Sequence, residues 1–259
     1  MKHLLIVFLT LSPLSALGQS PLSGVDMTLP KMTQAQMTRA DVVARLAAAT
    51  ADAPADFTRV WLNNLDLSGL DFSNAILRAT SLNGANLSGS TLDGAILSQS
   101  WMIGANLSGA SLVGAELFQT QLSQADLSDT DFTNARTAAD FTKANLNRAV
   151  FKGADFSADM RNQSMGLMRG VLSSARGSDV DFTDAKMSRA DLEFAKLPNA
   201  DFTNADLSMA TLGGADLTGA TLSGADFTNA DLTATRLIDV RGADQANLGA
   251  AKNLDRAIR

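Results

Sequence analysis

A large apolar residue recurs at every fifth position of this chain from residue 57 to residue 132. A five-residue step turns an α-helix by about 500°, so these residues would scatter around a helix instead of forming one stripe. In a flat strand, side chains alternate between two faces, so an odd spacing would send successive residues to opposite sides. The spacing therefore predicts a chain that bends once per five residues and points each large residue at a common axis, as in a solenoid. The sixteen positions are Phe57, Leu62, Leu67, Phe72, Leu77, Leu82, Leu87, Leu92, Leu97, Met102, Leu107, Leu112, Leu117, Leu122, Leu127 and Phe132.

A longer period of twenty residues gives the number of bends per coil. When the sequence is written in rows of twenty, Ile76 aligns with Ile96, and Trp61 aligns with Trp101 two rows later. One column holds Val60, Thr80, Ser100 and Thr120 where most repeats have alanine. Twenty residues make four repeats, so the pattern predicts a four-sided coil in which each residue stacks on its equivalent in the next coil.

The repeat unit itself has a recognisable form. Residues 105–109 read Ala-Asn-Leu-Ser-Gly and residues 205–209 read Ala-Asp-Leu-Ser-Met, following a pattern A-(D/N)-L-x-x. In this pattern the chain resembles the pentapeptide-repeat family over most of residues 55–250. The resemblance implies an all-β fold, a right-handed quadrilateral parallel β-helix, which we expect to span residues 55–249.

The first 18 residues have the features of a secretory signal peptide. A basic start at Lys2 is followed by an apolar run over residues 4–11, and Ala16 to Gly18 provide the small residues of a cleavage site. The run is too short to cross a bilayer, which takes about 20 residues. We therefore expect cleavage after Gly18 and a periplasmic or secreted product with no membrane insertion after the signal is removed.

Both ends of a solenoid need covering, because they would otherwise expose core side chains and unpaired backbone. Residues 19–54 are interpreted as a linker and a short capping helix, with Thr38 and Asp41 as the helix start and Pro54 after its end. Residues 250–259 are interpreted as a C-terminal cap with apolar residues at helical spacing. In the family, C-terminal elements sometimes dimerise, so a homodimer through this end is an open alternative.

The repeat is interrupted once. Phe132 is followed by the next large core residue at Phe141, and Phe156 by Leu167, after which Leu172 restores the original phase. Gly177 also leaves one core position empty. Residues 157–166 are predicted to form a bulge or loop, either as a tolerated repeat error or as a partner-binding feature. The candidate partner surface around it is Met160, Arg161, Met165, Met168 and Arg169.

Composition excludes several classes of function. The chain has no cysteine, and its one histidine, His3, lies in the signal segment, so the usual metal ligands and proton-transfer groups are lacking. Without residues 1–18 the chain holds 27 acidic and 20 basic residues, a balance that disfavours nonspecific nucleic-acid binding. Repeat geometry accounts for the Asp, Ser and Thr residues, so we expect no enzyme activity, no cofactor and no metal site.

The leading hypothesis is an exported, non-catalytic scaffold that presents rigid faces to a protein or other partner in the cell envelope. The family resemblance implies a second hypothesis, a mimic of DNA that binds and protects DNA gyrase, although an exported chain would not meet that cytoplasmic enzyme. A third is a structural protein whose stacked aspartates bind divalent cations. Acidic charge is uneven, since residues 79–135 and 197–235 contain no Lys or Arg.

Overall fold

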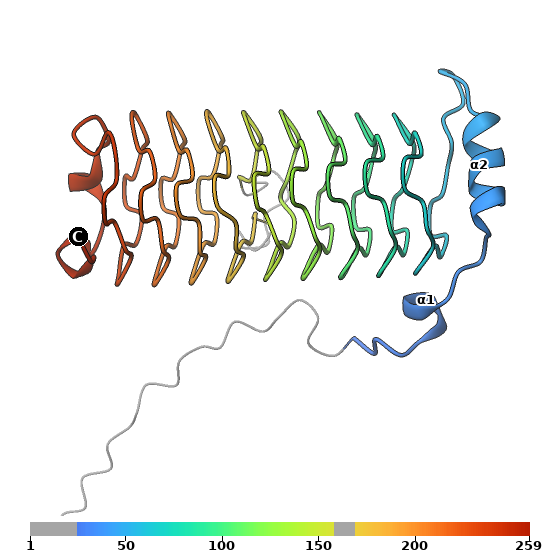
Figure 1. Ribbon diagram of the computed structural model, residues 1–259, viewed down its shortest axis with the longest axis horizontal. Coiled ribbons are helices and arrows are strands. Elements are labelled where there is room, and N and C mark those ends of the chain that lie inside the picture. Colours follow the sequence, from blue (N-terminus) through green and yellow to red (C-terminus); the bar gives the residue numbers. More distant parts are fainter. Residues whose placement is uncertain (1–24, 158–168) are drawn as a thin grey trace, which may run out of the picture.

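The protein is described here by a computed structural model, which covers residues 25–157 and 169–259. The backbone winds into a long, regular coil, with the helices α1 (Pro30–Thr33) and α2 (Arg39–Ala47) at one end and the C-terminus at the other (Figure 1). Two 3₁₀ turns, η1 (Leu248–Ala250) and η2 (Leu254–Arg256), lie at the C-terminal end. Within the described ranges, neighbouring coils pair through isolated parallel bridges instead of extended strands.

Most bridges between coils join residues twenty apart, four to a coil, so the coil has four faces as the twenty-residue period predicts. We number the faces by their columns of bridging residues. Face 1 runs from Asp56 to Asp226, face 2 from Trp61 to Lys252, face 3 from Asp66 to Ile258 and face 4 from Asp71 to Arg241. The right-handed sense that the resemblance implies stays a prediction.

Residues 105–109 show how one repeat makes one side of the coil. Ala105 and Leu107 are fully buried, whereas Asn106 and Ser108 are partly exposed. Asn106 N–H donates to Ala85 in the coil before, and Leu107 N–H donates to Asp126 in the coil after, both at 2.8–2.9 Å. Gly109 then takes a φ of 65°, a left-handed conformation that glycine adopts without strain. The apolar residues thus face inward because the chain turns after every fifth residue.

The interruption has two parts. Bridges from 121↔140 to 136↔155 join residues 19 apart, so one residue is missing there, and Thr137 fills the core position that the sequence analysis had skipped. Bridges from 140↔171 to 155↔186 join residues 31 apart, so eleven residues are added after Phe156. Among the described residues, Leu172 is the next large buried side chain, and it restores the phase as predicted. The predicted core residue Leu167 lies outside the described residues.

The core position at Gly177 is buried, and the backbone of Leu146 lies against it. A Cβ atom on Gly177 would lie 2.6 Å from the carbonyl carbon of Leu146, so the backbones of the two coils approach closely here. The same part of the core is rich in phenylalanine, with Phe151 stacked on Phe182 at 5.3 Å between ring centroids and Phe156 at 5.2 Å from Phe151.

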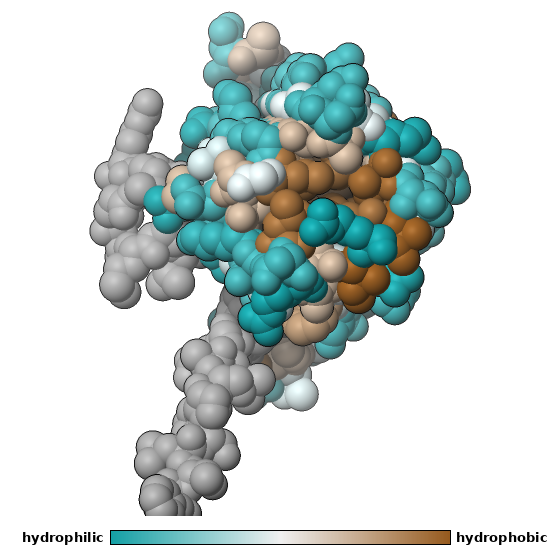
Figure 2. Space-filling view, turned by 90° about the vertical axis from the view of Figure 1, so that its left-hand side faces the viewer, coloured by the Kyte–Doolittle hydropathy of each residue, from teal (hydrophilic) through white to brown (hydrophobic). Residues whose placement is uncertain are grey.

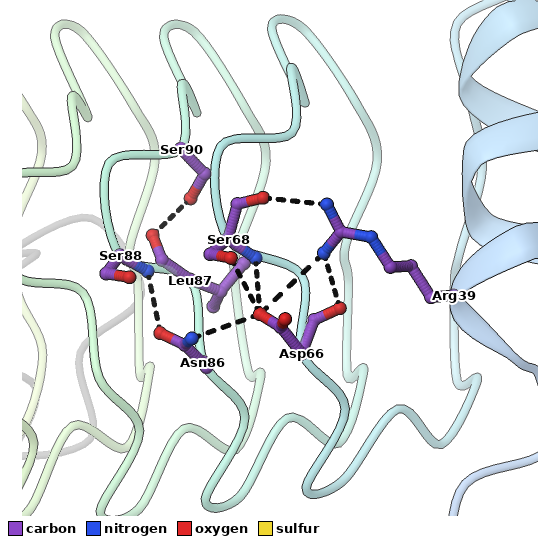
Figure 3. Close-up of polar contacts among 7 residues, drawn as sticks. All are labelled: Arg39, Asp66, Ser68, Asn86, Leu87, Ser88 and Ser90. Carbon is purple, nitrogen blue, oxygen red and sulfur yellow. Dashed lines mark hydrogen bonds and ion pairs between the residues drawn. The ribbon is translucent and has the colours of Figure 1, made fainter.

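Helix α2 covers the N-terminal end of the coil. It begins with the capping box predicted from Thr38 and Asp41. Its arginines reach the carbonyl oxygens that the first coil would otherwise expose. Arg39 binds those of Asp66 and Ser68 (Figure 3). Arg45 binds that of Asp56. Backbone groups at the edge of a sheet need such partners.

The C-terminal end is closed by a partial coil. The backbone N–H groups of Leu232 and Leu237 donate to the carbonyl oxygens of Lys252 and Ile258. The predicted helical spacing of this segment is realised only as the short turns η1 and η2, because the segment also pairs with the coil beneath it. Figure 2, which looks onto this end, shows hydrophobic residues gathered over its centre, with hydrophilic residues around most of them.

Candidate functional site

Most outward aspartates are used within the repeat itself. The Asp66 carboxylate accepts hydrogen bonds from the N–H and the hydroxyl of Ser68, at 3.1 and 2.7 Å, and another from Asn86 in the next coil, at 3.0 Å (Figure 3). The bonds from Ser68 hold the pKa of Asp66 below its ordinary value. The same turn is found at many repeats, including those of Asp201, Asp206, Asp216, Asp226 and Asp231. These residues are therefore structural.

In ranges 25–157 and 169–259, no three His, Cys, Asp or Glu side chains are grouped as they would be around a metal ion. In that part of the chain, no helix has the length and apolar character needed to cross a bilayer.

Of the predicted partner surface, the structure describes Arg169. Its guanidinium forms an ion pair with Asp191 on face 2, with 3.4 Å between Nη2 and Oδ2. Both side chains are about one-third exposed or less. Met160, Arg161, Met165 and Met168 lie outside the described residues. The pair places Arg169 on face 2, beside the residues that follow Asp191.

The residues after Asp191 depart from the rest of the surface. Glu193 and Phe194 are both exposed, and 62% of the Phe194 surface is accessible to solvent. Phe194 and Met209, at 40%, are the two large apolar residues exposed on the described faces between the end caps. The outward Ile76 and Ile96, by contrast, are partly buried and bridge to each other. Phe194 was not among the residues predicted from sequence, although an aromatic residue at the fifth position of a repeat could have signalled it.

The five-residue repeat of this coil is matched by a known family model. The model described as pentapeptide repeats matches eight copies, in residues 55–89, 71–109, 102–136, 137–158, 178–214 and 210–241. The chain belongs to the pentapeptide-repeat family. The match covers most of the four-sided coil, so the resemblance seen in residues 105–109 and 205–209 is confirmed.

Two solved structures illustrate what the chain is similar to. One is HetL, a pentapeptide repeat protein involved in heterocyst differentiation regulation from the cyanobacterium Nostoc sp. strain PCC 7120, with 28% identity and a TM-score of 0.36. That comparison covers 86% of this chain and 100% of HetL. The other is QnrB1, a plasmid-mediated fluoroquinolone resistance protein, with 21% identity, a TM-score of 0.40 and coverage of 74% and 92%. A search of curated proteins gave no match.

Proposed function

We propose that this pentapeptide-repeat protein is an exported, non-catalytic scaffold whose flat faces bind a protein partner in the cell envelope. The observation that carries the proposal is that the inward and outward residues of each repeat have separate roles. The inward residues form one continuous core, and the outward aspartates hold the turns, as Asp66 does with Ser68. What varies along the faces is a set of side chains held in columns by the rigid backbone, an arrangement suited to recognising another surface.

Export is the second part of the proposal and rests on residues 1–18, with cleavage after Gly18. The partner is then a protein of the periplasm, the envelope or the medium. Cross-linking in the native envelope, followed by mass spectrometry of the captured proteins, tests the scaffold function. We expect one or a few proteins to be captured reproducibly. A chain that cross-links to no protein would contradict it.

The interruption after Phe156 provides a candidate partner surface, consisting of Met160, Arg161, Met165, Met168 and Arg169. Methionine adapts to varied surfaces and arginine is enriched at interfaces. Replacing residues 158–166 with a shorter linker that keeps the phase of Leu172 should leave the β-rich circular dichroism and the melting temperature nearly unchanged and abolish partner capture. Unchanged partner capture would show that residues 158–166 are a tolerated repeat error. A collapsed fold would show that these residues have a structural role.

The C-terminal end supports self-association as a further part of the proposal. Ile258 is 44% exposed at this end, next to partly buried apolar residues that include Leu248 and Leu254. A homodimer formed here would bury the apolar centre seen in Figure 2. Sedimentation of the wild-type chain and of Ile258→Glu tests this dimer. We expect the wild type to be a dimer and Ile258→Glu, with its added charge, to be a monomer. A monomeric wild-type chain would contradict the proposed dimer.

A further inference from the structure

Phe194 occupies a backbone conformation that does not suit it. Its φ is 57°, and it is the one aromatic residue among the non-glycine residues with positive φ in the described ranges. Asparagine and aspartate tolerate this region better than bulky residues. Asn199, Asn204 and Asn229 occupy it at equivalent turns nearby. The local backbone therefore favours asparagine over phenylalanine at position 194.

Burial does not explain the choice of phenylalanine either. The ring is mostly exposed and lies along the coil over Gly214, where an added Cβ would come within 2.7 Å of it. The absence of a side chain at Gly214 thus leaves the ring room to lie against the next coil. A large aromatic side chain that is strained and exposed contributes little to folding, whereas such residues are enriched in protein interfaces.

Beside the ring the surface is open. Gly213 has no side chain, and a Cβ atom built there would have only two neighbours within 4 Å, both at 3.9 Å: Glu193 Cγ and the carbonyl oxygen of Thr233. Its φ lies outside the left-handed region, so this position would accept a side chain without strain. The space between Glu193 and Thr233 is therefore available to a group from outside.

The charge around this space is acidic. Partial burial and the negative charges of Asp191 and Asp231 raise the pKa of Glu193, and Arg169 opposes the shift. Arg169 is paired with Asp191, and the Asp231 carboxylate accepts hydrogen bonds from Thr233 and Asn253. Within the part of the chain that the structure describes, Glu193 is then the one of these three carboxylates left to meet a partner. A cation is the complementary group.

We infer that Glu193, Phe194 and Gly213 form a docking surface on face 2 for a protein segment that carries a lysine or arginine beside an apolar side chain. The cation would lie near the Glu193 carboxylate and the face of the Phe194 ring, and the adjoining apolar group would occupy the space over Gly213. Arg169 borders this surface through its pair with Asp191. The inference rests on the proposed protein-binding function and names the face and the partner chemistry.

A random dodecapeptide display library, panned against the mature chain with subtraction against Phe194→Asn, tests the inference. We expect enriched peptides with Lys or Arg next to Leu, Ile or Phe. Binding of a synthetic enriched peptide should weaken about ten-fold or more in Phe194→Asn and in Gly213→Arg, since aromatic anchors carry much of an interface's affinity. The melting temperature of Phe194→Asn should be unchanged or higher, because asparagine relieves the strained backbone.

Two matched controls separate this surface from general effects. Ala79→Asn makes the same kind of change at another left-handed turn, where φ is 51°, and Ser108→Arg adds the same charge on face 3. Both should bind the peptide as the wild type does. No enrichment, enrichment of acidic peptides, or equal binding by Phe194→Asn would overturn the inference. If wild type and Phe194→Asn captured the same proteins equally in the envelope, the docking surface would be refuted. The proposed protein-binding function would still hold.

Discussion

The Arg39 guanidinium donates a hydrogen bond to the main-chain carbonyl oxygen of Asp66 at 2.6 Å, and so joins α2 to the first coil. A second bond goes to the carbonyl of Ser68 at 2.9 Å (Figure 3). Hydrogen bonds from charged groups stabilise by about 1.5–3 kcal/mol when shielded, and this side chain is partly exposed, so Arg39→Ala should cost about 1 kcal/mol. Urea unfolding measures this loss of folding free energy. Arg78→Ala, in the next coil, is the control, and equal effects of the two changes would argue against a capping role.

The core carries most of the stability. Leu107 is fully buried, and truncating such a residue leaves a cavity, so Leu107→Ala should lower the free energy of unfolding by about 2–5 kcal/mol. Ser108→Ala, at the adjacent outward position, should change it by less than about 0.5 kcal/mol. Thermal or urea unfolding compares the two. An unchanged transition in Leu107→Ala would show that the inward positions are assigned wrongly.

The repeating part of the fold could be predicted from sequence because one physical rule acts at every repeat. A large residue at each fifth position, as at Leu107, can share a core only if the chain bends at that interval. Thr137 escaped the prediction because a threonine does not mark a core position. The bonds from Arg39 and Arg45 to the first coil also escaped it, since they depend on how α2 lies across the end of the coil.

Gly177 should not tolerate a side chain. An added Cβ would lie 2.6 Å from the carbonyl carbon and 2.7 Å from the carbonyl oxygen of Leu146, both in rigid backbone. Overpacking of this kind costs about 1–3 kcal/mol, so Gly177→Ala should lower the melting temperature clearly. Gly213→Ala, at an outward position with open space, should not. Equal melting temperatures for the two variants would show that the coils at Gly177 separate more easily than their packing indicates.

Acid should weaken the hydrogen bonds that aspartate carboxylates accept at the turns. Bonds from Thr228 and Asn247 lower the pKa of Asp226 in the folded chain. The stability that the Asp226 carboxylate contributes is thus fully present above the ordinary carboxyl pKa, about 3.9. It is lost as the pH falls through the lower pKa that Asp226 has in the folded chain. Wild type should be more stable than Asp226→Asn at pH 7, and the difference should shrink below about pH 4. Melting curves from pH 7 to about pH 3 test this, and a constant difference would contradict it.

The candidate site was harder to predict than the fold. Arg169 was selected because it follows the interruption, and the structure shows it paired with Asp191. Phe194 was passed over because a sequence pattern assigns no conformation to the fifth residue of a repeat. Only the backbone shows that this residue is strained at a φ of 57°, and only the neighbouring coil shows that its ring lies over Gly214. Such contacts join residues twenty apart through the stacking of coils.

The central claim is that the coil is a scaffold for a protein partner outside the cytoplasm. A photo-reactive residue placed at position 213 of the full-length precursor, in the cell that makes it, tests this most directly. After irradiation and fractionation, the account predicts a specific protein adduct in the periplasm or medium, on a chain that begins at Gln19, with no such adduct from position 108. An adduct found in the cytosol on a chain that still begins with Met1, joined to a topoisomerase, would contradict the account.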